Sequence, residues 1–477
     1  MARTRLESGS VIDGFTIGEL AHHGGMARLY TVTRPDIDFP MLMKVPEMGG
    51  GIDPALIVGF EMEQMIQPKL SGPHVARFVA NGDFSTQPYI VFERIAGPTL
   101  YPLLEDLPRP LDEVASLGAR IATALSDLHR QNVVHLDVKP SNVMFRATGE
   151  AVLIDYGLAH HLQLPDLVGE EFRLPYGTAP YMAPEQVLGE RSDFRSDLFA
   201  LGVLLYFLST GARPFGDPQR LKGLKRRLWR DPVPPRARRP EISRALQEVI
   251  LRCLEVNPDR RHPTAAQLAT DLQDLSQVRL SARADKLRRD GWAAVMKRRF
   301  NPDPGERLHP GTATRALAEA PIVMVAIDLS SEGTALGDAL RLTVSRIVEK
   351  TPNARIACVN VLKIARLALD SDLDAAGNNK HVARLVQLKH WAQPLKAPEG
   401  CLTYHVLEAV SPANAILEHA RDNFVDHIVM GARANSALRS LLGSVSAEVA
   451  AHAPCTVTVV RVRAPPHALL PPAIPDR

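Results

Sequence analysis

Four side chains in the first third of the chain have the types that phosphoryl transfer requires. Asp137, Lys139 and Asn142 lie within one short segment, and Asp155 follows the apolar residues 151–154, which we expect to form a strand. Transfer of a phosphoryl group needs a cradle for the phosphates, oxygen ligands for a metal ion and a base that orients the attacking hydroxyl. Two carboxylates, an amide and an ammonium group can supply the metal ligands, the base and a contact to phosphate.

The segment that carries the first three groups resembles a known catalytic loop. Residues 135–142 are similar to the H-R-D-x-K-x-x-N motif of eukaryotic-type protein kinases. The resemblance makes Asp137 the catalytic base, Lys139 a contact of the transferred phosphate and Asn142 a metal ligand. A lysine at the position of Lys139 is typical of serine/threonine kinases. Residues 155–157, Asp-Tyr-Gly, resemble the D-F-G element, whose aspartate holds magnesium.

Further motifs of the same family occur in the expected order over the first 275 residues. They are Lys44 as the phosphate-binding lysine, Glu63 as its partner, residues 177–185 as the substrate-site and A-P-E segment, Asp197 as the brace of the catalytic loop, and Arg261 as the partner of Glu185. Glu61 is an alternative partner for Lys44, although the motif favours Glu63. The resemblance is to bacterial serine/threonine kinases of eukaryotic type. It implies an α+β bilobal fold, ATP and Mg²⁺ (or Mn²⁺) as cofactors, and protein substrates.

The elements that must position these groups can be predicted from apolar spacing and helix-start signals. Residues 15–17 and 41–45 read as strands, and the second of them carries Lys44. Asp53 followed by proline predicts the start of the helix that carries Glu63. Apolar residues recur every three or four positions over 112–130, which predicts a buried amphipathic helix that leads to His135.

The nucleotide site departs from the family pattern. The motif G-x-G-x-x-G falls on His22, Gly24 and Ala27, so only its middle glycine remains, with Gly25 beside it. Because glycine permits positive φ and close approach of the backbone to phosphates, we expect weaker ATP binding or a stiffer loop. By resemblance, the adenine pocket comprises Leu29, Leu42 in place of a small alanine, Phe92 as gatekeeper, Glu93 and Ile95 of the hinge, and Met144 on the floor. This pocket should be tight.

The usual phosphate switch is also missing. Leu136 replaces the arginine that reads an activation-loop phosphate in the family, and residues 158–176 contain no serine or threonine. Thr178 matches a structural threonine of the substrate site. We therefore hypothesise that phosphorylation of the activation loop does not control this protein.

A second region, residues 321–463, alternates strands and helices, which predicts βαβ units and a parallel sheet. Its apolar strand 321–328, its Gly-Ala-Arg at 431–433 and its last strand at 456–460 resemble the universal stress protein family, a doubly wound α/β fold. The ATP-binding branch of that family has G-x-x-G-x9-G-S/T. Gly431, Gly443 and Ser444 match this motif, with Ala434 in place of a glycine and a spacer one residue short, and Asp328 matches the residue near the adenine and ribose. ATP binding and a nucleotide-free dimerisation or partner domain both remain open.

The bulk properties limit the classes of function. The net charge is +3, which gives no global sign of a nucleic-acid binder, and none of the four cysteines forms a CxxC pair. No apolar run approaches the roughly 18 residues of a membrane span. We expect a cytoplasmic protein with a kinase domain at 12–275, a basic linker at 276–320 with a helix at its start, a stress-protein-like domain at 321–463 and a disordered tail at 464–477.

Two stretches of basic residues admit more than one interpretation. Between residues 276 and 320, ten Lys and Arg stand against five Asp and Glu, a net charge of +5. There, Trp292 and Phe300 beside Lys297 could contact anionic lipid, although a solvated helix is the simpler interpretation. The same choice applies to residues 220–230.

Two functions from different classes fit the whole sequence. The first is an active serine/threonine kinase in stress signalling, whose second domain senses a state or forms a homodimer. The second is a pseudokinase, a nucleotide-gated binding module without transfer activity. The degenerate glycine loop and Leu42 favour the second, whereas the complete set of Lys44, Glu63, Asp137, Lys139, Asn142 and Asp155 favours the enzyme.

Overall fold

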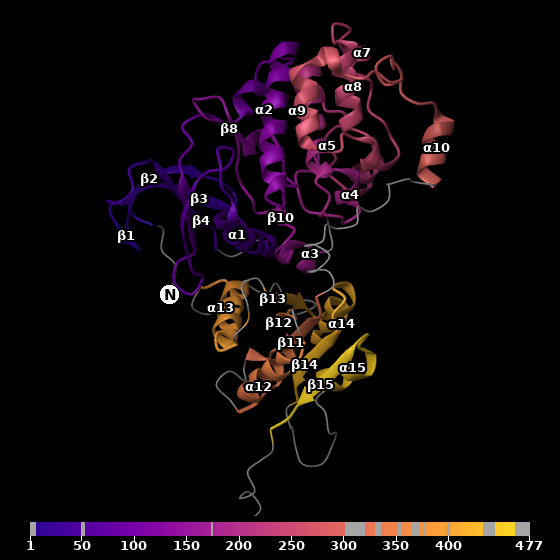
Figure 1. Ribbon diagram of the computed structural model, residues 1–477. Coiled ribbons are helices and arrows are strands. Elements are labelled where there is room, and N and C mark those ends of the chain that lie inside the picture. Colours follow the sequence, from indigo (N-terminus) through magenta and orange to yellow (C-terminus); the bar gives the residue numbers. More distant parts are fainter. Residues whose placement is uncertain are drawn as a thin grey trace, which may run out of the picture. The chain divides into compact units, whose positions relative to one another are not determined.

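The computed structural model describes residues 6–48, 53–172, 175–300, 320–329, 335–351, 354–364, 373–374, 377–395, 397, 401–432 and 444–462. The chain divides into two compact units, an N-terminal unit that extends to Leu317 and a C-terminal unit that begins at Ala318 (Figure 1). Within the described ranges, every helix is too short or too polar to traverse the apolar layer of a bilayer.

The first part of the N-terminal unit is an antiparallel sheet with the strand order β1-β2-β3-β4-β6-β5. Its strands are β1 (Val11–Ile12), β2 (Phe15–His23), β3 (Ala27–Thr33), β4 (Met41–Pro46), β5 (Phe78–Gly82) and β6 (Tyr89–Glu93). Alternate residues such as Ile17, Tyr30 and Met43 are buried on one face, as expected for a half-covered antiparallel sheet. The strands predicted at 15–17 and 41–45 are confirmed, and the first continues to His23.

Helix α1 (Pro54–Ile66) packs beside this sheet and begins where the sequence predicts. The Asp53 carboxylate accepts a hydrogen bond of 2.9 Å from the backbone N–H of Ala55, and Pro54 occupies the first helical position. Both features satisfy or remove donors that would be unpaired at a helix start. They place Glu63 on the last two turns of the helix.

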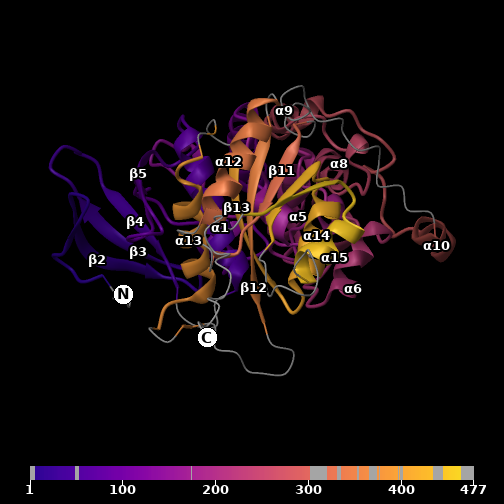
Figure 2. The same cartoon turned by 90° about the horizontal axis from the view of Figure 1, so that it is seen from below.

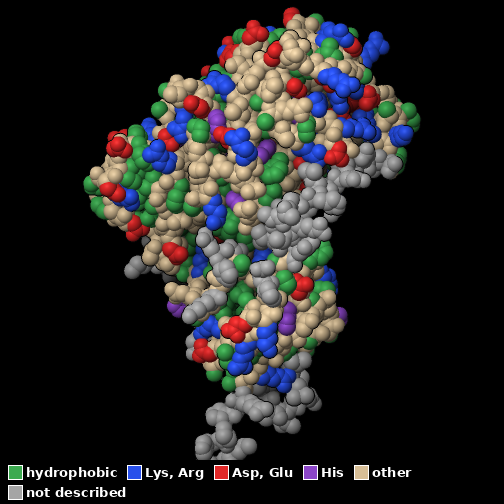
Figure 3. All heavy atoms as spheres, in the orientation of Figure 1, with side chains coloured by type: hydrophobic (Ala, Val, Ile, Leu, Met, Phe, Trp, Pro, Cys, Tyr) green, Lys and Arg blue, Asp and Glu red, His purple; other side chains and the backbone are tan. Residues whose placement is uncertain are grey.

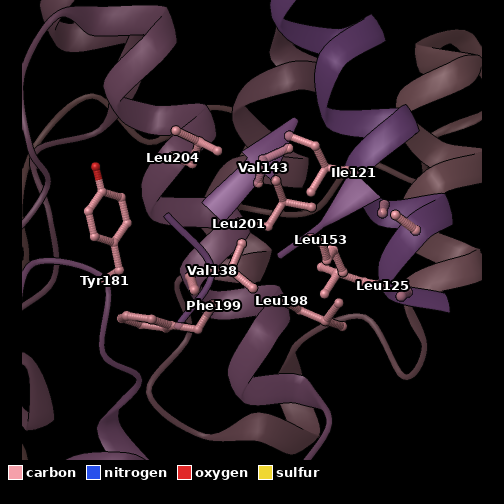
Figure 4. Packing of buried hydrophobic residues seen from close by; sticks show 14 of the residues in the cluster. Ile121, Leu125, Val138, Val143, Leu153, Tyr181, Leu198, Phe199, Leu201 and Leu204 are labelled. Atoms are coloured by element: carbon pink, nitrogen blue, oxygen red, sulfur yellow. The ribbon is translucent and has the colours of Figure 1, made fainter. Parts of the chain in front are cut away.

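The second part of the N-terminal unit is mainly helical. The long helices α2 (Leu111–Arg130), α5 (Arg195–Thr210), α8 (Arg244–Cys253) and α9 (Ala265–Gln273) pack around one core (Figure 1). Ile121 and Leu125 of α2 meet Leu201 and Leu204 of α5 there, close to Val143 and Leu153 (Figure 4). The helix predicted at 112–130 is confirmed and begins one residue earlier. Burial of its apolar stripe therefore holds the start of the catalytic loop.

Short elements connect these helices. They are η1 (Gln67–Lys69), η2 (Tyr101–Leu104), β7 (Val133–Val134), η3 (Pro140–Asn142), β8 (Val143–Phe145), β9 (Ala151–Leu153), β10 (His160–His161), α3 (Leu167–Glu171), α4 (Pro184–Val187), α6 (Leu221–Leu224), η4 (Lys225–Leu228), α7 (Pro235–Arg238), η5 (Pro258–Arg260) and η6 (Leu275–Gln277). Strands β8 and β9 form a hairpin, and β7 pairs with β10.

The segment after α9 differs from the expected linker. Its helix, α10 (Trp292–Phe300), covers the residues for which a solvated helix was the simpler interpretation, whereas the start of the 276–320 segment holds only the short η6, which ends at Gln277. The residues before α10 are bound to the helical core, because Gln247 Nε2 donates to the carbonyls of Arg283, Ala284 and Lys286 at 2.8, 3.1 and 2.8 Å. Arg283 also pairs with Glu248 at 3.0 Å. These long-range contacts leave no periodic signal in the sequence.

The C-terminal unit is a five-stranded parallel sheet with the order β13-β12-β11-β14-β15. Its elements are β11 (Ile322–Ala326), α12 (Ala335–Glu349), β12 (Arg355–Lys363), α13 (Lys380–Ala392), β13 (Leu402–Ala409), α14 (Pro412–Asp422), β14 (His427–Gly431), α15 (Ser444–His452) and β15 (Thr456–Val460). Helices α12 and α13 cover one face, and α14 and α15 cover the other (Figure 2). The predicted doubly wound α/β fold is confirmed.

Two details of this unit bear on the sequence predictions. Strand β11 ends at Ala326, so Asp328 lies just beyond the strand that we expected to include it. Gly443, Ala434 and the tail predicted to be disordered, 464–477, lie outside the described residues.

A buried ion pair supports the helical part of the N-terminal unit, and its loss should be costly. Arg261 donates to both carboxylate oxygens of Glu185, at 2.6 and 2.7 Å, and the two residues are 2% and 5% exposed. Arg261→Ala leaves a buried charge without its partner, so we expect the free energy of unfolding of this unit to fall by about 3–5 kcal/mol. Urea denaturation measures this change. Arg130→Ala, at an exposed pair, should cost under about 1 kcal/mol, and an equal loss in both variants would contradict the prediction.

Candidate active site

The catalytic-loop segment is held in place by one fully buried carboxylate. Asp197, at the start of α5, accepts hydrogen bonds from the backbone N–H groups of His135 and Leu136 at 2.9 and 2.8 Å. It also lies 2.9 Å from His129 Nε2 at the end of α2. The brace expected for Asp197 is therefore present. His129 was not singled out from the sequence, because a histidine at the end of a helix is also a common capping residue.

Asp137 lies at the centre of a polar cluster. Its Oδ2 accepts from Lys139 Nζ at 2.6 Å and from Asn142 Nδ2 at 3.0 Å, and its Oδ1 accepts from Thr178 Oγ1 at 2.7 Å. Lys139 Nζ also donates to Thr178 Oγ1 at 3.0 Å. The structure thus brings together the three residues predicted from the loop and adds Thr178, which we had interpreted as structural. The hydroxyl of Thr178 shows where a second hydroxyl could meet Asp137 and Lys139.

A second charged cluster joins three separate elements. Lys44 Nζ on β4 donates to Glu63 Oε2 on α1 at 2.6 Å and to Asp155 Oδ1 beyond β9 at 3.0 Å. Glu63 is the glutamate that contacts Lys44. Burial alone would lower the pKa of the lysine, but the carboxylates of Asp155 and Glu63 outweigh it and raise that pKa. The Lys44 ammonium in turn lowers the pKa of Asp155. Burial raises the pKa of Glu63 above its usual value, and the Lys44 ammonium opposes that rise.

The D-F-G-like residues lie directly against helix α1. A Cβ atom added to Gly59 would lie 2.9 Å from the carbonyl oxygen of Gly157, so only glycine permits this approach without movement. Asp155 has a φ of +69°, which is rare for a non-glycine residue. Tyr156, in place of the usual phenylalanine, is buried and donates from its hydroxyl to Leu153 O at 2.8 Å. The tyrosine is thus accommodated without an unpaired hydroxyl.

One cavity of about 280 Å³ opens onto both clusters. Of the predicted site residues, those that line it are Lys44, Glu63, Asp137, Lys139 and Asp155. Lining residues that we did not predict include Met26, Asp53, Gly59, Phe60, Tyr176 and Thr178. Sequence spacing could not identify them, since they come from three separate parts of the chain.

The turn that replaces the glycine-rich loop is shaped differently from our expectation. Gly24 donates from its N–H to Ala27 O at 3.0 Å and closes the turn between β2 and β3. Neither Gly24 nor Gly25 has a positive φ, and a Cβ at Gly25 would meet nothing within 4 Å. The local backbone conformation therefore does not require glycine at Gly24 or Gly25. A need for glycine there would have to come from a ligand that approaches the turn closely.

The residues expected around adenine lie together on the sheet and the β8–β9 hairpin. Leu42 on β4 is directly opposite Phe92 on β6, and Leu29 is opposite Lys44. Phe92 and Met144 pack against a small apolar cluster that includes Ile95. The Glu93 side chain pairs with Arg146, which lowers the pKa of Glu93 and directs its carboxylate to that arginine. Only the backbone of Glu93 can therefore serve a ligand.

Apolar contacts and an ion pair hold the activation segment in place, and none of these contacts involves a phosphate group. Leu136, with a φ of +61°, packs with Val134, Leu162 and Phe194 where the family has an arginine. Further along, Asp166 Oδ2 accepts from Arg191 Nε at 2.6 Å, and Arg191 Nη2 donates to Leu158 O at 2.9 Å.

Asp166 combines two roles in this segment. Its Oδ1 accepts from Gly169 N at 3.2 Å at the start of α3. Burial opposes ionisation, but Arg191 and His160 overcome it and lower the pKa of Asp166. The group is consequently an anion down to acidic pH, and its contribution is lost only as the pH falls through that lowered value.

The C-terminal unit contains a separate cavity of about 390 Å³ at the carboxyl ends of its strands. Asp328, Gly431 and Ser444 line it, so three of the four residues predicted for a second nucleotide site lie together. Asn360 lines it as well and was not predicted. Asn360 is 7% exposed and donates from Nδ2 to Ile327 O at 2.8 Å, whereas its Oδ1 has no partner among the described residues.

Comparison with known proteins gives a consistent result for both units. Residues 55–272 match the protein kinase domain family, and residues 320–461 match the universal stress protein family. The chain is 31% identical over 265 residues to the serine/threonine-protein kinase PknB of Mycobacterium leprae. The aligned region covers 54% of this chain and 42% of that protein. It is 30% identical over 264 residues to the probable serine/threonine-protein kinase SCO3848 of Streptomyces coelicolor, covering 54% of this chain and 39% of that protein.

The chain spans less than half the length of these curated relatives. Among solved structures, the PknI kinase domain of Mycobacterium tuberculosis is 24% identical, with a TM-score of 0.45, and covers 57% of this chain and all of that domain. The chain therefore contains a protein kinase domain related to bacterial serine/threonine kinases, followed by a universal stress protein domain.

Proposed function

We propose that this protein transfers the γ-phosphoryl group of ATP to serine or threonine hydroxyls of other proteins. The observation that carries the proposal is the shared cavity in which the Asp137–Lys139 pair faces the Lys44–Glu63–Asp155 cluster. The Asp137–Lys139 pair can bind a substrate hydroxyl group, and the Lys44–Glu63–Asp155 cluster can bind a polyphosphate.

Each charged residue has a distinct part in this reaction. Asp137 would accept a hydrogen bond from the substrate hydroxyl and take its proton, as it now accepts from Thr178 Oγ1. Lys139 would offset the negative charge that gathers on the transferred group. Lys44, fixed by Glu63, would hold the phosphates of ATP so that the reacting atoms are aligned.

The residues present also fit the expected metal ion. Asp155 and Asn142 offer oxygen atoms, which are the ligands that Mg²⁺ prefers, and this ion usually binds through one or two protein groups together with phosphates. Among the described residues no group of three or more His, Cys, Asp or Glu could hold a metal by itself, which agrees with that mode. When bound, Mg²⁺ (or Mn²⁺) would offset phosphate charge.

The rival function is a nucleotide-gated binding module without transfer activity. It is supported by the missing glycines at His22 and Ala27 and by Leu42, a larger residue than the usual alanine at a position expected to contact adenine. The enzyme remains the better supported function, because a scaffold has no need for the Asp137–Lys139 pair.

We propose further that the activation segment works without phosphorylation. The Asp166–Arg191 ion pair supplies a permanent anion and cation where other kinases rely on an added phosphate. The apolar contact of Leu136 with Leu162 replaces the arginine that would read such a phosphate. Control would then come from outside this segment, and the second domain is the nearest candidate.

For the C-terminal unit we propose a second nucleotide site with a sensing role in stress signalling. Asn360 lines this cavity, and its buried Oδ1 has no partner among the described residues, which favours a ligand that carries an N–H donor such as the amino group of adenine. The exposed edge of β15 would allow a homodimer. A cytoplasmic location would agree with ATP as the substrate. It would also agree with the free cysteines that occur in both units.

The transfer reaction can be tested with Asp137→Asn. Loss of the base should lower kcat by about 10²–10⁴-fold, whereas ATP binding through Lys44 should persist. Purified protein is incubated with labelled ATP, Mg²⁺ and a general protein substrate, and incorporated label is counted. Asp106→Asn, at a carboxylate whose side chain is 93% exposed, is the matched control. Equal labelling by wild type and Asp137→Asn, or no labelling by wild type, would favour the binding-module function.

The permanent anchor can be tested with Asp166→Asn. Removal of a charged hydrogen-bond partner costs about 1.5–3 kcal/mol, so we expect kcat to fall by about 10- to 100-fold as the segment loses its order. Asp36→Asn, at an exposed ion pair, should leave activity unchanged. Treatment of the wild type with a protein phosphatase should also change nothing, and a large loss of activity after that treatment would show that a phosphate is required.

The second nucleotide site can be tested by counting bound ATP. Isothermal titration should give two sites in the wild type, one in Lys44→Met and none detectable in Lys44→Met with Asn360→Leu. Loss of the Asn360 acceptor should weaken the second site by about 5- to 100-fold, since an unmatched donor costs about 1–3 kcal/mol. One site in the wild type and none in Lys44→Met would assign a nucleotide-free role to the C-terminal unit.

A further inference from the structure

Helix α10 lies at the edge of the N-terminal unit (Figure 1) and carries an apolar ridge. Trp292, Met296 and Phe300 are spaced by four residues and therefore share one face of the helix. Trp292 is 76% exposed and Phe300 is 81% exposed. Large aromatic side chains grouped on an exposed face commonly mark an interaction site.

The charges on α10 are divided between its two faces. Arg298 faces inward and pairs with Asp231 at 3.1 Å and with Asp290 at 2.8 Å, so it fastens the helix to the unit. Lys297 and Arg299 flank the apolar ridge and are exposed. The helix is thus anchored by one cation, while two others lie beside the aromatic residues.

A neighbouring basic segment enlarges this surface. The Arg299 guanidinium lies 5.8 Å from the ring centre of Trp229, which places α10 beside the segment 220–230. We had interpreted all of that segment as solvated, but Arg227 is 1% exposed and donates to the carbonyls of Ala179 and Met182. Arg227 therefore holds the segment in place.

The remaining cations of the segment point outward. They are Arg220, Lys222, Lys225, Arg226 and Arg230, all exposed, and within the described ranges none of them is in an ion pair. Leu221 among them is 40% exposed. We call these residues, with Trp292, Met296, Lys297, Arg299 and Phe300, the basic–aromatic face. Lys and Arg side chains gather on this side of the N-terminal unit (Figure 3).

We propose that the basic–aromatic face binds the surface of an anionic lipid bilayer. A helix with Trp and Phe on one side and flanking Lys and Arg has the composition of helices that lie in the membrane interface. The aromatic residues would enter the headgroup region, and the cations would meet the lipid phosphates. Neither step uses the catalytic cavity, so this inference is independent of the proposed kinase activity.

The composition of the ridge distinguishes lipid from other anionic partners. A single-stranded nucleic acid would stack its bases on the aromatic rings, but Met296, which lies between them in the sequence, has no flat face for stacking. An acidic peptide would be matched by the cations and would leave Trp292 and Phe300 in water. Only a partner that combines negative charge with an apolar layer uses every part of the face.

The full chain can be tested by sedimentation with vesicles. We expect binding to vesicles of an equal mixture of phosphatidylglycerol and phosphatidylcholine, and none to phosphatidylcholine alone. Trp292→Glu or Phe300→Glu should weaken binding by about 10- to 100-fold, since each removes an aromatic group that the bilayer would bury. Lys225→Ala and Lys297→Ala should each weaken it by about fivefold. Binding should also fall as NaCl rises from about 0.05 to 0.5 M.

Matched controls lie on the C-terminal unit. Phe424 is 85% exposed and Lys363 is exposed, so Phe424→Glu and Lys363→Ala should bind vesicles as the wild type does. Circular dichroism and phosphotransfer should be unchanged in Trp292→Glu, which shows that the unit still folds. Absence of binding to the anionic vesicles, or equal binding by all variants, would overturn the proposal. So would binding of single-stranded RNA or heparin that depends on Trp292 while the vesicles do not bind.

Discussion

The Lys44 ammonium group is the contact on which the arrangement of the N-terminal unit depends. It joins β4, helix α1 and the loop after β9, which are distant in the sequence. Because both carboxylates are nearby, the lysine stays charged despite its burial. The close backbone approach of Gly59 to Gly157 completes this junction. Any movement of α1 would separate Glu63 from Lys44 and would open the cavity where phosphates are expected.

The opposite wall of that cavity is built on different physical grounds. A buried carboxylate, Asp197, gathers two backbone N–H groups and so holds a loop in which Leu136 has a positive φ. The loop then presents Asp137 and Lys139 as a preformed pair. The activation segment reaches the same order through Asp166 and Arg191. A fixed ion pair thus orders the segment, which agrees with the proposal that control comes from another part of the protein.

The two units differ in how they present binding groups. In the N-terminal unit the polar groups of the cavity are paired with one another, and a ligand must compete for them. In the C-terminal unit Asn360, which lines the cavity with Asp328 and Gly431, leaves one acceptor unpaired within the part of the chain that the structure describes. An unsatisfied buried acceptor is costly and is retained where something outside the chain can satisfy it. The basic–aromatic face adds a third kind of site, in which apolar side chains are left in water.

The sequence by itself determined the order of the kinase motifs, the start of α1 at Asp53, a helix at 112–130 that begins one residue earlier in the structure, and the parallel sheet of the C-terminal unit, because caps and apolar periodicity are local properties. The tertiary structure alone decided that Thr178 meets Asp137, that Asp166 meets Arg191 and that Gln247 binds the segment before α10. It also decided that Gly24 and Gly25 need no positive φ and that Arg227 is buried. These contacts join residues that are distant in the chain, and their partners depend on how the elements pack, which local spacing does not encode.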